Sequence, residues 1–184
     1  MSQGEETLAK RLGTTAHVSP LRMKLERLSR QFPSSTAASV EDWLVDVAND
    51  RGARIVVRDV CRDGLSVGVP EGMLSSEELV VGICLLQALD RPQMLRLAAQ
   101  LISRQALDML RLCRLAERER AGAVLAALAR AALRVSPKHV AWSQIISRFG
   151  GEKPLRDTLL HWTRLAEPVM MRGGCNAQTW SLVA

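Results

Sequence analysis

The chain has 184 residues, of which 47% are hydrophobic and 24% charged, and its formal net charge is +6. This length fits one medium domain that can fold without a metal or a disulfide, and the composition excludes a mainly disordered chain. No apolar run approaches the roughly 20 residues of a membrane-spanning helix, and the first 31 residues lack a signal peptide's apolar middle region. We therefore expect a cytoplasmic protein with no membrane partner.

The positive charge is concentrated in the second half of the chain. Residues 91–134 contain nine arginines against three acidic residues, and residues 135–184 contain six basic against three acidic residues. The first 90 residues contain ten basic and thirteen acidic residues. This asymmetry indicates a polyanionic partner, although a solvated, arginine-rich helix surface explains it as well. Arginine outnumbers lysine by 21 to 4, a bias typical of GC-rich bacterial genomes.

Residues 1–38 are predicted to be a mobile N-terminal arm that contains one short helix. Ser19 followed by Pro20 is the pattern of a helix cap and a first helical residue. Three leucines at helical spacing would share one face of that helix: Leu21, Leu25 and Leu28. The helix should end before Pro33, and the Ser- and Ala-rich segment that follows is typical of a linker. We expect this helix to dock on the domain or on a partner.

Residues 39–135 are predicted to form a helical domain with one β-hairpin. Ser39 can cap a helix whose apolar residues recur at the helical period, and Gly52 suits its end. The β-branched residues of 53–70, together with the Asp63-Gly64 turn, predict a β-hairpin. Because one hairpin is not stable alone in water, it should pack on helices.

The clearest local signal lies at residues 74–78. Ser75 and Glu78 form a capping-box pattern, and Leu74 and Leu79 have the spacing of a hydrophobic staple. A helix should therefore begin near Ser76, and its body is apolar almost all round, as in a central buried helix.

The segment from Arg91 to Arg134 should contain two or three further helices, because single helices average about 11–12 residues. Asp90 and Pro92 mark the start of the first of these. We predict breaks near 103–105 and 119–122.

Residues 136–184 are predicted to form two helices and a second hairpin, either as a separate part or in one domain with the preceding residues. A short helix over 139–151 ends at two glycines, and a second helix occupies 154–166. Residues 169–183 then have the pattern of strand, turn and strand. Over roughly the last 65 residues, the order of elements resembles a winged helix-turn-helix domain. The predicted fold class is mainly α with small β-hairpins (α+β).

The winged-helix resemblance implies that the helix at 154–166 enters the major groove of DNA. It would contact bases or phosphates through these residues, the last of them at the tip of the wing: Arg156, His161, Thr163, Arg164 and Arg172. Asp157 and Leu160 on the same face favour a protein partner instead. Phosphates repel a carboxylate, and an outward leucine is better explained by a covering protein surface.

No catalytic or metal-binding constellation is present in the sequence. The four cysteines are far apart, without ligand spacing, and we interpret them as structural thiols: Cys61, Cys84, Cys113 and Cys175. None of the three histidines has a second ligand at metal-binding spacing, and no phosphate-binding loop or nucleophile motif occurs. We predict a protein that is not an enzyme and uses no cofactor.

Two functions remain open at this point. The first is a non-catalytic bacterial regulatory or binding protein that engages nucleic acid through its basic C-terminal module. The alternative is a protein–protein interaction adaptor that uses the exposed face of residues 154–166 and the N-terminal arm. The apolar helices exceed the needs of one small core, which is compatible with a homodimer.

Overall fold

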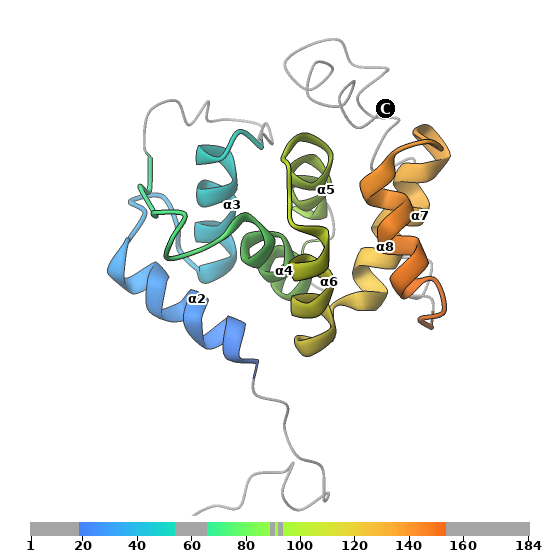
Figure 1. Ribbon diagram of the computed structural model, residues 1–184. Helices are drawn as coiled ribbons and strands as arrows, with labels where there is room; N and C mark the ends of the chain where they lie inside the picture. The colour runs from blue at the N-terminus through green and yellow to red at the C-terminus, as the bar shows by residue number, and fades with distance from the viewer. Residues whose placement is uncertain (1–18, 54–65, 89–90, 92–93, 154–184) are drawn as a thin grey trace, which may run out of the picture.

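The computed structural model describes residues 19–53, 66–88, 91 and 94–153. All regular structure in these ranges is helical, and the elements are arranged as Figure 1 shows. The seven helices of this part of the chain are α2 (Pro20–Gln31), α3 (Val40–Asp50), α4 (Ser76–Gln87), α5 (Leu95–Arg104), α6 (Met109–Arg118), α7 (Gly122–Val135) and α8 (Val140–Phe149).

The predicted α+β class is wrong: the described part of the protein has an all-α fold and contains no strand. The end of the first predicted hairpin, residues 66–70, is irregular. The carboxylate of Asp50, at the end of α3, holds it by accepting hydrogen bonds from the Ser66 hydroxyl (3.2 Å) and the Val67 N–H (2.6 Å). Val67 and Val69 pack against the helical core. Their β-branched side chains are thus partly buried against helices, without a strand.

The winged-helix prediction, and with it a DNA-binding module of that type, is also wrong. A winged helix needs a β-hairpin, and the described part of the chain is helical throughout its regular structure. Moreover, α7 and α8 contact α5 and α6 as well as each other, and their apolar residues belong to the same core as those of α4. In the described part of the chain, α7 and α8 therefore pack in the same core as the preceding helices. Residues 54–65 and 154–184, which include the other predicted hairpin segments, lie outside the described residues.

The predicted helix starts and breaks that fall on described residues are confirmed. The Ser19 hydroxyl accepts a hydrogen bond from the Arg22 N–H, and Ser39 caps α3 in the same way. At α4 both halves of the capping box are present, between Ser75 and Glu78. The breaks fall at Gln105, after α5, and at residues 119–121, between α6 and α7.

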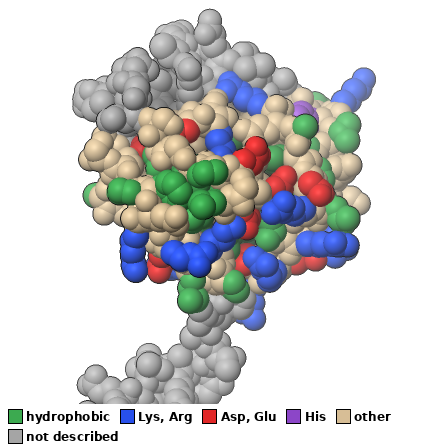
Figure 2. All heavy atoms as spheres, turned by 60° about the vertical axis from the view of Figure 1, so that its left-hand side comes forward, with side chains coloured by type: hydrophobic (Ala, Val, Ile, Leu, Met, Phe, Trp, Pro, Cys, Tyr) green, Lys and Arg blue, Asp and Glu red, His purple; other side chains and the backbone are tan. Residues whose placement is uncertain are grey.

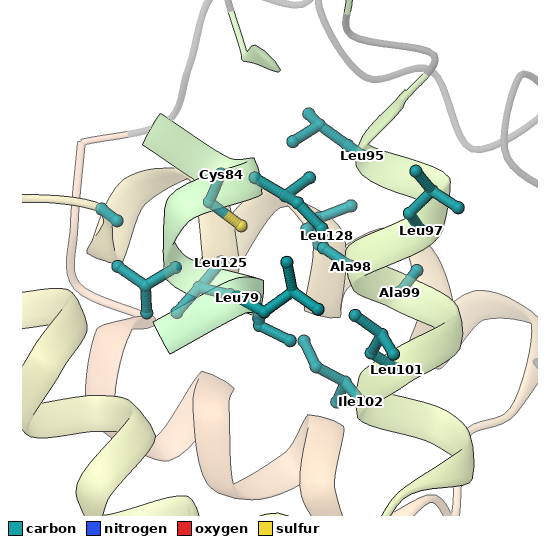
Figure 3. Packing of buried hydrophobic residues seen from close by; sticks show 14 of the residues in the cluster. Leu79, Cys84, Leu95, Leu97, Ala98, Ala99, Leu101, Ile102, Leu125 and Leu128 are labelled. Atoms are coloured by element: carbon teal, nitrogen blue, oxygen red, sulfur yellow. The ribbon is translucent and has the colours of Figure 1, made fainter. Parts of the chain in front are cut away.

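Helix α4 lies at the centre of the fold, where it contacts α2, α3, α5 and α6 (Figure 1). Figure 3 shows how Leu79 and Cys84 of α4 lie among the apolar side chains of α5 and α7. The side chains of α4 are buried on all sides of the helix, which confirms the prediction of a central buried helix. In the described ranges, no helix has the length and apolar content to cross a bilayer.

Helix α2, which the sequence placed in the N-terminal arm and for which it predicted docking on the domain or on a partner, packs against this core. The three predicted leucines are buried: Leu21, Leu25 and Leu28. Leu25 packs so closely on α4 that a Cβ atom at Gly82 would lie 2.7 Å from its Cδ1. The Trp43 indole N–H donates to the Phe32 carbonyl at 2.8 Å, which ties the end of α2 to α3.

Candidate protein-binding surface on α6

The residues that the sequence singled out as a site all lie outside the described residues: Arg156, Asp157, Leu160, His161, Thr163, Arg164 and Arg172. The structure therefore does not bring them together or separate them. Within the described ranges, no group of three His, Cys, Asp or Glu side chains is placed to hold a metal ion.

The two cysteines that the structure describes, Cys84 and Cys113, are buried free thiols. Burial raises the pKa of Cys84 to about 12 and also raises the pKa of Cys113, to which the nearby Glu117 charge contributes. A thiol with a raised pKa is a poor nucleophile because little thiolate forms at neutral pH. Both thiols are consistent with the structural role predicted from the sequence.

An open hollow of about 430 Å³ lies along the outer side of α6. We call it the α6 surface, and its lining residues are Asp108, Leu110, Arg111, Arg114, Leu115 and Arg118. Three of the six are arginines that follow one another at helical spacing, so they form a row along the helix. The hollow thus combines cationic and apolar side chains in one place.

The amphipathic sequence of α6 explains why this row faces outward. Leu112, Cys113 and Ala116 are buried on the opposite side of the helix, where α6 contacts α4, α7 and α8. Two hydrogen bonds of Asp108 fix the start of α6. Its carboxylate accepts from the Arg111 N–H at 3.0 Å, and its own N–H donates to Glu77 Oε1 of α4, also at 3.0 Å.

Leu110 is the most unusual residue of the α6 surface, because 61% of it is exposed. Leu115, which follows Leu110 later in the same helix, is only partly buried. Single exposed leucines are common on proteins. This one, however, lies within a hollow and beside cationic groups, which is the mixed apolar and charged character of a protein-binding surface.

The arginines of the row differ in how they are used. Arg118 forms an ion pair with Glu119 at 2.8 Å. For Arg111 and Arg114 the described residues provide no hydrogen-bonded or ion-paired side chain; their charges act on Glu78 and Glu117 from a distance. The one carboxylate in the hollow, that of Asp108, already caps α6. The surface therefore has a cationic excess.

Other basic residues of the same half of the chain have internal partners. Arg91 pairs with Asp42 and Arg148 pairs with Glu117. Arg104 donates to the Gly52 carbonyl and Arg130 donates to the Gly150 carbonyl. The sequence showed the surplus of arginine but could not show which arginines are used in such contacts. The row on α6 is identified only once these contacts are known.

The sequence did contain a signal for the α6 surface. Arg111, Arg114 and Arg118 have the spacing i, i+3 and i+7, which places them on one helical face.

Comparison of the chain with protein-family models, with curated proteins and with solved structures gave no match.

Proposed function

We propose that the protein is a non-catalytic adaptor that binds an acidic, amphipathic segment of a partner protein on the α6 surface. The observation that carries this proposal is the exposed Leu110 beside the row of Arg111, Arg114 and Arg118. An amphipathic helix with carboxylates beside an apolar residue would complement both features, as in helix-in-groove recognition. Arginine suits this role because its planar guanidinium can bind a carboxylate through two hydrogen bonds.

The apolar contact distinguishes a protein partner from nucleic acid. Burying an exposed leucine contributes roughly 1.5–3 kcal/mol, whereas one exposed ion pair contributes about 0.2–1 kcal/mol. A phosphate backbone offers Leu110 no apolar partner, and covering it with phosphates would leave that contribution unused. The α6 surface therefore favours a ligand that supplies both a carboxylate row and an apolar side chain.

A designed helical peptide with a row of glutamates and two leucines along one face tests the proposal. Fluorescence anisotropy with the full chain should show binding, and a scrambled peptide of the same composition should bind more weakly. Replacing both Arg111 and Arg114 with Glu should abolish binding, because the charge of the row is reversed. Leu110→Ser should weaken binding with little change in its salt dependence, since it removes only the apolar contact.

A matched control separates the α6 surface from net charge. Arg134 and Lys138 are exposed on the α7–α8 side of the molecule, and replacing both with Glu changes the net charge by the same amount. This control should retain peptide binding. The proposal is overturned if the peptide does not bind the unsubstituted chain, or if both pairs of substitutions weaken binding equally.

Mixed-sequence duplex DNA in the same anisotropy assay tests nucleic acid as the alternative partner. Phosphate binding weakens steeply with salt, with a log–log slope of about −0.9 for each neutralised phosphate. DNA that binds more tightly than the peptide at physiological salt, and that loses this binding in the Arg111/Arg114 variant, would contradict a protein partner.

A further inference from the structure

The two ends of the arginine row each share a carboxylate with α2. At one end, Arg118 Nη2 lies 2.8 Å from Glu119 Oε1, while Glu119 Oε2 accepts a hydrogen bond from the Ser19 hydroxyl at 2.6 Å. The Leu21 N–H also donates to Glu119 Oε1, at 3.3 Å. Glu119 is only 2% exposed. A single buried carboxylate is thus held both by the start of α2 and by the end of the row.

At the other end, α2 binds Glu78 of α4, and the charge of Arg111 acts on this carboxylate from a distance. Lys24 Nζ of α2 donates to both carboxylate oxygens of Glu78, at 2.7 and 2.8 Å. Burial alone would raise the pKa of Glu78. The hydrogen bonds from Lys24 and the Ser75 N–H, together with the charges of Lys24 and Arg111, outweigh burial and lower the pKa below its usual value. Arg111 is therefore close enough to act on the same carboxylate as Lys24.

Figure 2 shows the side of the molecule on which α2 comes forward. Lys and Arg side chains gather mainly on the lower half of this face, and Asp and Glu side chains lie among them. The contacts of α2 agree with this mixture, because Arg22 pairs with Glu26 and Lys24 pairs with Glu78. The cations of α2 thus include one, Lys24, that neutralises a carboxylate of α4.

These contacts indicate that docked α2 favours the binding of an acidic ligand. A carboxylate that is largely removed from water requires compensating charges and donors. With α2 docked, Lys24 and the start of α2 supply part of that compensation. Without α2, Glu78 would lose the charge of Lys24, and Glu119 would lose the Ser19 hydroxyl and the Leu21 N–H. The negative charge of both carboxylates would then be less compensated and would repel a ligand carboxylate.

We propose that docked α2 prepares the α6 surface, because it supplies a charge to Glu78 and hydrogen-bond donors to Glu119 and so leaves more of the positive charge of Arg111 and Arg118 to act on the acidic partner. This inference rests on the proposed function. Lys24 and Ser19 are positioning residues in it, since they act on the ligand through Glu78 and Glu119. Because linkage is reciprocal, a bound acidic ligand also stabilises α2 in its docked position.

A double-substitution cycle with the designed acidic peptide tests the inference. Lys24→Met should weaken peptide binding by about two- to fivefold, the range expected for one partly exposed charge. In a Glu78→Gln background the same Lys24→Met change should have no effect, because the carboxylate that Lys24 neutralises is gone. Glutamine at this position can still form the capping box. Arg27→Met, an exposed change on the same helix, is the matched control and should change affinity less than Lys24→Met.

The outcomes separate the inference from the proposed function. No peptide binding by the unsubstituted chain overturns both. Peptide binding that Lys24→Met leaves unchanged, or weakens equally with and without Glu78, overturns the role of α2 alone.

Hydrogen exchange gives a second measurement that needs no substitution. Saturating peptide should slow amide exchange in α2, around Leu25 and Leu28, at least twofold relative to the free chain. Exchange that is unchanged or faster with bound peptide would show that α2 docking and ligand binding are not positively linked.

Discussion

Glu78 interacts with three different elements of the fold. It accepts hydrogen bonds from Lys24 of α2 and from the Ser75 N–H at the start of α4, and it lies within the influence of Arg111 of α6. Its own N–H donates to the Ser75 hydroxyl. Glu78, whose capping role follows from the local sequence, therefore also links α4 to a helix that is distant in the chain. The local role was predictable, whereas the ion pair with Lys24 and the influence of the Arg111 charge were not.

The capping box gives a prediction about stability. Ser75→Ala removes the acceptor for the Glu78 N–H at the start of the central helix, and should lower the free energy of unfolding by about 1 kcal/mol. Urea denaturation followed by circular dichroism measures this change. Ser143→Ala on the exposed side of α8 is the control, with an expected change below about 0.5 kcal/mol. Equal effects of the two substitutions would contradict a special role for this cap.

The buried thiol of Cys84 gives a second prediction at the same scale. Burial raises its pKa to about 12, so at pH 8 it is almost entirely protonated as well as inaccessible. Iodoacetamide should leave Cys84 unmodified in the folded chain over a time that gives complete modification in urea. Mass spectrometry of the Cys84 peptide provides the measurement. Rapid modification in the folded chain would show that the α4 core opens frequently.

At the scale of elements, helix boundaries were predictable because their signals are local. Ser19, Ser39 and Ser75 each cap a helix by accepting a hydrogen bond from a backbone N–H three residues away, and such a bond depends on neighbouring residues alone. The strand prediction failed because β-propensity depends on what covers the side chains. Val67 and Val69 pack on helices, which no local pattern could indicate.

The docking of α2 leads to a prediction at the scale of the element. Leu25 is fully buried between α2 and α4, so Leu25→Ala should reduce the free energy of unfolding by about 2–5 kcal/mol. Met23 lies on the same helix but is 59% exposed. Met23→Ala should therefore change the free energy of unfolding by less than about 0.5 kcal/mol. Chemical denaturation of both variants measures the difference. Similar small effects would mean that α2 contributes little to stability.

At the scale of the whole molecule, the charge asymmetry of the sequence was real but could not be located. The arginine-rich half contributes internal contacts, such as that between Arg104 and the Gly52 carbonyl, as well as the row on α6. Which arginines remain available depends on contacts between residues far apart in the chain. The site predicted at 154–166 falls outside the described residues and remains a prediction.

The carboxylates that join the helices make overall stability depend on pH. The pKa values of Glu78 and Asp42 are both lowered. Burial alone would raise each pKa, but the hydrogen bond and charge of Lys24 at Glu78, and of Arg91 at Asp42, outweigh burial. A lowered folded-state pKa contributes stability that is present above the unfolded values, 4.5 and 3.8. This stability is lost as the pH falls through the folded values. The chain should therefore become less stable on acidification below about pH 4.5.

Urea denaturation between pH 7 and pH 3 measures this dependence. The Glu78→Gln variant should lose less stability over the same range, because it has one fewer carboxylate to protonate. An identical loss in both proteins would show that Glu78 does not contribute to the acid sensitivity.

The close approach of Leu25 to Gly82 means that these two positions share one fixed volume. A methyl group added at Gly82 would force the end of the Leu25 side chain to shift, so Gly82→Ala should be tolerated better together with Leu25→Val than alone. In any chain with this fold, a bulky residue at the α4 position would imply a small one on α2, or a helix seated elsewhere.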